Sequence, residues 1–416
     1  MKVLYICPDT GIDVLGRKGA SVHVREMIAA FARAGNDVDL IAPRLVKPGA
    51  APLSVAATVV RIPVSDEIQR TRAGIDEFVS GRGIQSSLAK DVRRVLYDAD
   101  LNAALSARYQ DDPPDLIFVR LSLLSTAGVA LAAATGRPLV VEVNSPLADE
   151  HDRYRNGALG ELARHVEGEV IRAATAVLVV SQALVDHVVR LGVDPDRVVV
   201  CPNGIDPSRF RRHRVSAERR RQLGIPDGLI VGFVGGLRTW HGAPLLPAIL
   251  AGLRDRGADV RLVIAGDGPA RAEIESEAER LGVADRTVLL GPVDHDDIPD
   301  LISSFDIALA PYPDLTHDFY FSPLKLFEYL GCGVPVVASS VGQIASTLRS
   351  GVHAVLTPAG DVSSAVDACM QLIIDPGYAR EIATAGAALV HDRYTWDQNA
   401  AVAMSRAGLT HSEAPT

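Results

Sequence analysis

Short, continuous apolar runs bounded by turn residues recur along the chain and constrain its fold more than any other feature. Such runs are typical of strands buried on both faces of a parallel sheet, whereas half-exposed strands alternate apolar and polar residues. Before Pro202 they lie at 3–7 (VLYIC), 37–42 (DVDLIA), 115–119 (DLIFV), 138–143 (PLVVEV) and 176–180 (AVLVV). After it they lie at 229–235 (LIVGFVG), 261–266 (RLVIAG), 287–291 (TVLLG), 306–311 (DIALAP) and 335–339 (PVVAS).

The stretches between these runs carry apolar residues at helical spacing. Residues 21–34 form one such stretch, which ends before Gly35, and residues 270–281 form another. A strand, a helix and a parallel strand make a βαβ unit. Because 416 residues are too many for one ordinary core, the pattern predicts an α/β chain of two Rossmann-like domains with parallel sheets.

We place the two domains at 1–205 and 206–390, followed by a helical tail at 391–416 that crosses back to the first domain. Parallel sheets bind their ligands beyond the carboxyl ends of the strands. We therefore expect the two sheets to face a central cleft, with the functional residues in the loops that follow the strands.

Composition and charge exclude several classes of protein and site. The net charge of −9 disfavours nucleic acid as a partner. Four widely spaced cysteines without a CxxC pair indicate free thiols in a reducing compartment, and the apolar run at the N-terminus is too short for a signal peptide or a membrane span. Together they favour the cytoplasm. GxxxxGK[ST] and HExxH motifs are absent, which excludes P-loop ATPases and zincins.

A basic run at 207–223 has two interpretations. It could contact an anionic membrane surface or an acidic ligand. The interpretation that we favour is a solvated helix start that follows the interdomain linker.

Glycine-rich loops after the first strand of each domain are candidate anion sites. Gly19 and Ala20 stand where a helix begins, and the exposed N–H groups of a helix N-terminus attract anions. The GxGxxG spacing of a dinucleotide site is missing there, and the second strand ends at Arg44 rather than at an acid. In the second domain, Arg238 and His241 precede a helix and could clamp a pyrophosphate, although each could equally be an ordinary surface or capping residue.

Two further segments of the second domain carry candidate ligands. Asp267 follows a strand and could bind a ribose, although it lies about thirty residues beyond the first glycines rather than about twenty. At 322–330, Ser322 and Pro323 are predicted to be the N-cap and the first helical residue. Leu324 and Lys325 would then lie in the first turn, with Lys325 aimed at the cleft. Glu328 could accept hydrogen bonds from two ribose hydroxyls, unless it forms only a surface pair with Lys325.

These segments resemble family 4 of the glycosyltransferases, retaining enzymes with the GT-B fold, over essentially the whole chain. The resemblance rests on VEVNSP at 141–146, PNGID at 202–206, GGLRTWHG at 235–242, AGDGP at 265–269 and SPLKLFEYLGCGVPVVAS at 322–339.

The resemblance implies roles for individual residues. Glu328 matches the second glutamate of the family's Glu-x7-Glu motif, which binds the donor ribose, whereas the first glutamate is replaced by Tyr320. Backbone amides around Phe321 and Ser322 would then take its place. The family's clamp arginine and lysine align with Gly236 and His241, so we expect Arg238 and Lys325 to supply the permanent charge, with His241 helping as a hydrogen-bond donor or when protonated.

The family comparison also implies roles for residues outside the clamp. Asn144 lies where many relatives place a histidine that touches the donor sugar, with Glu142 just before it, although both could be ordinary strand-end residues. The backbone around Pro292 and Val293 is similar to the family's base-reading loop. Asn144, Arg238 and Lys325 are thus the predicted catalytic residues.

The predicted reaction is metal-independent transfer from a UDP- or GDP-sugar with retention, in which the leaving diphosphate takes the acceptor proton. No cofactor is expected, and no DxD-like carboxylate cluster suited to Mg²⁺ is present. The acceptor, a small molecule, a glycan or a lipid-linked sugar, would bind the loops around 44–110. A homodimer and a peripheral contact with the inner face of the membrane are compatible with the sequence. A nucleotide-sugar epimerase and a non-catalytic sugar-nucleotide-binding regulatory protein stay open as alternatives.

Overall fold

The computed structural model describes residues 1–47, 52–315 and 319–409. The chain divides into two compact units, and the boundary between them lies between Pro202 and Asn203. The first unit comprises Met1–Pro202 and Trp396–Thr416, and the second unit comprises Asn203–Thr395. Each unit is built on one parallel sheet, so the prediction of two α/β, Rossmann-like domains is confirmed.

The sheet of the first unit has seven parallel strands in the order β3-β2-β1-β4-β5-β6-β7. The order in which the chain adds strands reverses between β1 and β4, which is the switch point of a doubly wound sheet. The strands are β1 (Lys2–Ile6), β2 (Asp37–Ala42), β3 (Thr58–Arg61), β4 (Leu116–Arg120), β5 (Leu139–Val143), β6 (Ala176–Val179) and β7 (Val198–Val200).

The sheet of the second unit repeats this arrangement with the order β10-β9-β8-β11-β12-β13, and its switch point lies between β8 and β11. The strands are β8 (Leu229–Val234), β9 (Val260–Ala265), β10 (Thr287–Gly291), β11 (Ile307–Ala310), β12 (Val336–Ser339) and β13 (Val355–Thr357).

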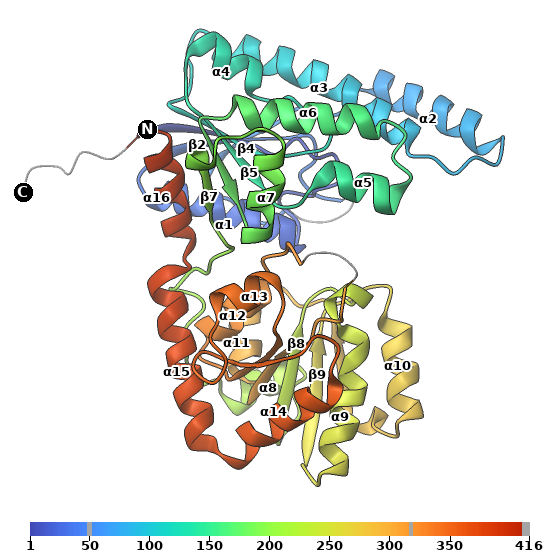
Figure 1. The fold of residues 1–416 in the computed structure, drawn as a ribbon, viewed down its shortest axis with the longest axis vertical. Helices are drawn as coiled ribbons and strands as arrows, with labels where there is room; N and C mark the ends of the chain where they lie inside the picture. The colour runs from blue at the N-terminus through green and yellow to red at the C-terminus, as the bar shows by residue number, and fades with distance from the viewer. Residues whose placement is uncertain (48–51, 316–318, 410–416) are drawn as a thin grey trace, which may run out of the picture. The chain divides into compact units, whose positions relative to one another are not determined.

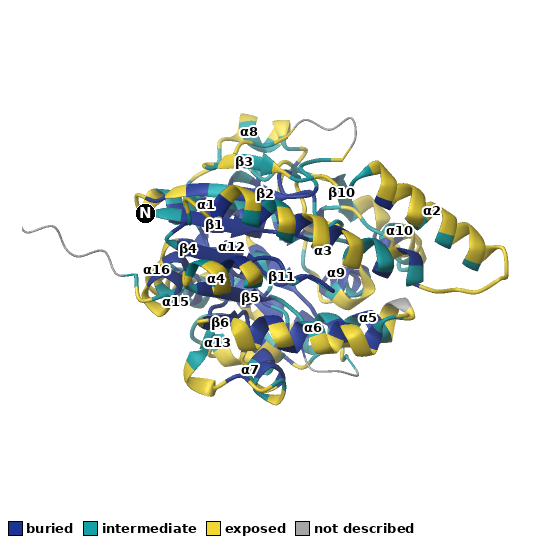
Figure 2. Ribbon diagram, turned by 90° about the horizontal axis from the view of Figure 1, so that it is seen from above, coloured by how far each residue is buried: buried dark blue, intermediate teal, exposed yellow. Residues whose placement is uncertain are grey.

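The helices of the first unit are α1 (Gly19–Arg33), α2 (Asp66–Ser80), α3 (Leu88–Tyr109), α4 (Val129–Thr135), α5 (Leu147–Arg155), α6 (Gly160–Ala173), α7 (Gln182–Arg190) and α16 (Trp396–Arg406). Helices α2 and α3 lie side by side (Figure 1), and most of α2 is exposed (Figure 2). Helix α16 packs on α1, where the Trp396 ring meets the His23 ring edge-on at 4.8 Å.

The helices of the second unit are α8 (Ala217–Gln222), α9 (Leu246–Asp255), α10 (Arg271–Arg280), α11 (Ile298–Ser303), α12 (Leu324–Gly331), α13 (Gly342–Thr347), α14 (Val362–Ile374) and α15 (Pro376–Arg393). Alternate side chains of β8 enter two cores. Ile230 and Val234 pack with α11 and α12, whereas Val231 and Phe233 pack with α9, α10 and α14. Burial on both faces explains why the apolar runs are continuous.

No helix in the described part of the chain has both the length and the apolar character that crossing a bilayer requires.

The loops after β8 and β9 approach each other so closely that Gly266 and Gly268 have no space for a side chain. Gly266 has a φ of 135°, and a Cβ atom there would lie 1.9 Å from the carbonyl oxygen of Gly235. Gly268 is similarly confined, because its Cβ atom would lie 2.4 Å from the carbonyl oxygen of Leu237. These contacts hold the loops after β8 and β9 together.

Gly266→Ala should lower the free energy of unfolding of the second unit by more than about 2 kcal/mol, because it adds both backbone strain and a clash with main chain. Gly257→Ala is the matched control, since Gly257 has a φ of 82° with no atom within 4 Å of a Cβ atom, and it should cost about 1 kcal/mol. Urea unfolding measures both values. Equal losses would show that the close approach of the two loops is not a constraint.

Candidate functional site

The loops that follow β8 and β9 form the frame of the candidate donor site. The Gly235 N–H donates to the carbonyl of Ala265 at 2.9 Å, and the Leu237 N–H donates to the carbonyl of Asp267 at 3.0 Å. The Asp267 side chain is exposed and accepts a hydrogen bond from the N–H of Gly268 at 2.8 Å. Its carboxylate thus takes part in its own turn, and a ribose contact of Asp267 stays a prediction.

Helix α12 begins one residue later than the sequence predicts. Pro323 is its N-cap and Leu324 its first residue, so the assignment of Ser322 as N-cap and Pro323 as first helical residue is wrong. The Ser322 hydroxyl instead accepts a hydrogen bond from the Asn203 N–H at 2.8 Å, and the Asn203 side-chain amide donates to the Ser322 carbonyl at 2.5 Å. Since no side chain caps α12, its first N–H groups are available to an anion.

Lys325 lies in the first turn of α12 and is buried. Its Nζ atom is 3.9 Å from the centroid of the Phe233 ring and has no hydrogen-bond partner among the described residues. Burial lowers the pKa of Lys325 to about 7, against the opposite effect of Glu328. Desolvation therefore disfavours the ammonium form of Lys325 in the ligand-free protein, and a permanent charge on Lys325 stays a prediction.

His241 and Arg238 lie near Lys325 on the loop after β8. Burial, followed by the charge of Lys325, lowers the pKa of His241 to about 4, and Arg238 acts in the same direction. His241 is thus neutral near pH 7. Its Nδ1 lies 2.9 Å from the Gly236 carbonyl, which can only accept, so the proton sits on Nδ1 and Nε2 is an acceptor. The Arg238 guanidinium is exposed and lies 5.0 Å from the Trp240 ring.

Glu328 is buried one helical turn after Lys325. One of its carboxylate oxygens lies 3.2 Å from His295 Nε2, and Arg209 donates to the carbonyl of His295 at 3.0 Å. The second carboxylate oxygen has no partner among the described residues. Lys325 and Glu328 are both buried, so they are not a surface pair, and the free oxygen of Glu328 suits a hydroxyl ligand.

Three other predicted donor residues lie in the second unit. Val293 follows β10 and packs against the core. Tyr320 is buried, and its ring centroid lies 4.4 Å from that of Phe321. Tyr320 thus contributes an aromatic ring where the family's pattern has a carboxylate. Residues 316–318, which precede this segment, lie outside the described residues.

The predicted residues of the first unit fall in two places. Gly19 and Ala20 open α1, which has no side-chain cap. Asn144 follows β5, and its amide donates to Glu142 at 3.0 Å. Burial acts to raise the pKa of Glu142, but His23 at 2.7 Å, Arg120 at 3.2 Å and Asn144 outweigh it and lower that pKa to about 2. Glu142 is therefore ionised and orients Asn144.

Sequence reasoning missed His295 and Asn203 as parts of the site. His295 belongs to the loop that follows β10, and the sequence singled out only the backbone of that loop. Asn203 belongs to the PNGID segment, whose role became apparent only from its contacts with Ser322. Each acts on α12 across a long sequence separation, which no local pattern reveals.

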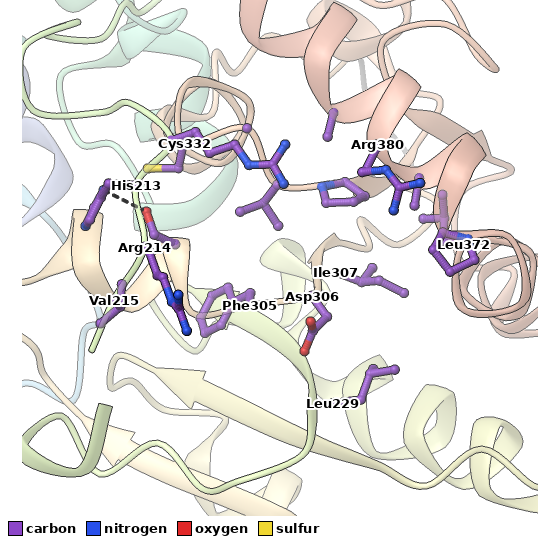
Figure 3. A pocket seen from close by; sticks show the side chains of 18 of the residues that line it. His213, Arg214, Val215, Leu229, Phe305, Asp306, Ile307, Cys332, Leu372 and Arg380 are labelled. Carbon is purple, nitrogen blue, oxygen red and sulfur yellow. Dashed lines mark hydrogen bonds between the residues drawn. The ribbon is translucent and has the colours of Figure 1, made fainter. Parts of the chain in front are cut away.

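A pocket of about 1160 Å³ opens at the other edge of the second sheet, at the amino ends of β8, β11 and β12 (Figure 3). Its lining includes Arg214 and Arg380 and none of the predicted donor residues. The basic run contributes to this pocket and starts α8, which Ser216 caps. Arg219 of this run pairs with Asp297 and Asp300 at 2.5 and 2.7 Å, which is compatible with the favoured interpretation as a helix start.

Comparison with known proteins identifies the family. The family model described as glycosyl transferase 4-like domain matches residues 18–204, and the one described as glycosyl transferases group 1 matches residues 228–375. The chain is 27% identical over 396 residues to a D-inositol 3-phosphate glycosyltransferase of Xylanimonas cellulosilytica, which covers 92% of this chain and 89% of the relative. It is 25% identical to a glycogen synthase of Mycobacterium tuberculosis, over 95% of this chain and 92% of the relative.

Solved structures share the fold. Alr3699/HepE of Anabaena, crystallised with UDP and glucose, is similar with a TM-score of 0.68 at 20% identity, over 97% of this chain and 99% of that one. WaaG, a glycosyltransferase of lipopolysaccharide biosynthesis, gives a TM-score of 0.69 at 15% identity, over 99% of this chain and 100% of that one. The chain therefore belongs to family 4 of the glycosyltransferases, the glycosyl transferases group 1, and has the GT-B fold.

Proposed function

We propose that the protein transfers a sugar from a nucleoside diphosphate sugar to an acceptor hydroxyl, with retention of configuration and without a metal ion. The observation that carries this proposal is the buried amino group of Lys325 at the uncapped start of α12, whose Nζ has no hydrogen-bond partner among the described residues. A buried cation without a counter-ion is costly, and a diphosphate would supply two negative charges at this point.

The residues around Lys325 fit the rest of such a donor. The loop of Gly235 and Gly236 would let its backbone approach a diphosphate, since neither glycine has a side chain. The free carboxylate oxygen of Glu328 would accept from the ribose, and the backbone at Val293 would read the base. We propose a UDP-sugar as donor, because a structural neighbour was crystallised with UDP, with a GDP-sugar as the second candidate.

The chemistry needs charge stabilisation more than an enzymic nucleophile. As the bond between the anomeric carbon and the diphosphate oxygen breaks, negative charge grows on that oxygen, which accepts the proton of the incoming acceptor hydroxyl on the same face. Lys325 and the N–H groups of α12 would stabilise this charge, with Arg238 beside them. Asn144, held by Glu142, would orient the donor sugar.

We further propose a cytoplasmic location, which four free and buried cysteines support. The first unit would hold the acceptor, and the relatives' names include both inositol phosphate and glycogen as substrates or products. Peripheral membrane contact is a proposal supported by exposed Phe78 and Ile84 near the end of α2. A homodimer stays a prediction from the sequence.

Replacement of Lys325 by methionine should lower kcat by on the order of a hundredfold or more, with a smaller effect on KM, because the cation acts on charge that grows in the transition state. The unbranched side chain keeps the contact with Phe233, so Tm should not fall. His241→Ala should reduce kcat less, because neutral His241 offers no charge. A larger loss for His241→Ala, or a change only in KM for Lys325→Met, would contradict the assignment.

Binding of UDP-glucose should weaken as the pH rises above about 7. Below that pH, Lys325 is already protonated in the free protein. Above it, binding must take up a proton, so affinity should fall by up to about tenfold per pH unit. Calorimetry from about pH 6 to about pH 8.5 tests this, and Lys325→Met should give a flat profile. A flat profile for the wild-type protein would show that Lys325 does not titrate at the donor site.

The overall reaction can be tested by incubating the protein with UDP-glucose in EDTA, either in water alone or with a panel of acceptors. Proton NMR then identifies the products. The α-linked donor should yield an α-linked product, or α-glucose first on hydrolysis, without added metal. An inverted product, or activity that requires Mg²⁺ or Mn²⁺, would contradict the proposal. An epimerised donor without acceptor would favour the epimerase alternative, and tight UDP binding without any turnover would favour the regulatory one.

A further inference from the structure

Four arginines gather at the carboxyl edge of the first sheet. Arg44 follows β2, Arg72 lies on α2, and Arg93 and Arg94 lie on α3. The charges of Arg94, Arg72 and Arg44 all act to lower the pKa of Arg93, after burial as the largest cause. The loop that follows β1 joins them through Thr10, whose hydroxyl lies 2.6 Å from Arg93 Nη2. All four belong to the segment at 44–110, which shows no recognisable acceptor motif.

The nearby carboxylates leave the positive charge of two of these arginines poorly neutralised. Arg94 pairs with Asp91 at 2.8 Å, and Arg44 pairs with Asp13. Arg72 reaches only Asp76 of its own helix, at 3.8 Å. Arg93 forms no ion pair with any carboxylate of the described residues, and Asp9, the one acid that raises its pKa, accepts from the Gly11 N–H at 2.6 Å.

Both poorly neutralised arginines bury a donor without an acceptor. The Nε atoms of Arg72 and Arg93 are shielded from solvent and have no hydrogen-bond partner in the described part of the chain. A buried donor without a partner is unfavourable, and more so when the group is charged. Arg72 and Arg93 are both half-buried rather than fully solvated, so an anion that approached from solvent would meet two guanidinium groups with few acceptors of their own.

We propose that Arg72 and Arg93, flanked by Arg44 and Arg94, bind a phosphate or carboxylate group of the acceptor. This rests on the proposed function, in which the first unit holds the acceptor. The planar guanidinium group donates two parallel hydrogen bonds to either anion, which suits it to this task. The cluster also lies beyond the carboxyl ends of β1 and β2, the edge where doubly wound sheets bind ligands. This arrangement disfavours cationic acceptors, and neutral ones would leave Arg93 without a counter-ion among the described residues.

Titration of inorganic phosphate into protein saturated with UDP tests the subsite, because UDP fills the donor's diphosphate site first. Wild-type protein should bind phosphate saturably and show a rising Tm. Arg72→Gln and Arg93→Gln should each weaken phosphate binding at least tenfold. Arg108→Gln is the matched control, since it removes the same charge from α3 about 22 Å away along the helix. It should bind phosphate like the wild type.

A second readout separates the subsite from a structural role. Without phosphate, Arg93→Gln should melt close to the wild type, because the repulsion that it removes offsets the lost hydrogen bond to Thr10. If this variant fails to fold, the phosphate affinity of Arg72→Gln decides the proposal. Glycerol 3-phosphate should displace phosphate and glycerol should not, while displacement by glycerate would show that a carboxylate also fits.

Absence of saturable phosphate binding by the wild type, or equal affinity in the Arg72, Arg93 and Arg108 variants, would overturn the proposal. Failure of UDP to bind would count against the proposed function instead, and phosphate titration of the UDP-free variants would still decide the subsite.

Discussion

The organisation of the second unit's site depends on the burial of the Lys325 amino group against the Phe233 ring. The amino group also sits beside Gly235, where a Cβ atom would lie 3.0 Å from Nζ. The glycine therefore makes room for the lysine, and the aromatic ring offers it only a weak substitute for a counter-ion. This arrangement lowers the pKa of Lys325 to about 7 and leaves its charge to be satisfied by a ligand. Because Lys325 is shielded from water, binding of an anion would stabilise its ammonium form.

Long-range hydrogen bonds hold the helix that carries Lys325. Asn203 binds Ser322 just before α12, and His295 binds Glu328 within it. The first contact is buried and the second is partly buried, so both are shielded from water and help to fix α12 on the sheet. The same principle operates in the first unit, where His23 and Arg120 fix Glu142, which in turn fixes Asn144. In each unit, contacts from distant segments of the chain hold candidate residues in place.

The sequence predicted the strands that are buried on both faces, together with the mostly half-buried β10, and missed β3, β7 and β13. Strand β2 has the bounds that its apolar run indicates, whereas the short and half-buried β3 and β13 show no such run. Lys325 and Glu328 could be singled out because they lie on an apolar helix. The start of α12 was misplaced because the partner of Ser322 is Asn203, 119 residues earlier in the chain. The pKa of Lys325 and the cluster around Arg93 depend on burial in three dimensions, which a local pattern does not contain.

The most direct test of this account is the pKa of Lys325 itself, measured by NMR on protein with ¹³C-labelled lysine and assigned with Lys325→Met. The account predicts a pKa near 7 in the free protein and a clear rise when UDP is bound, because the diphosphate supplies the missing counter-charge. An ordinary lysine pKa of about 10.4 in the free protein, or one that does not change with UDP, would contradict the claim that Lys325 is a buried cation reserved for the donor.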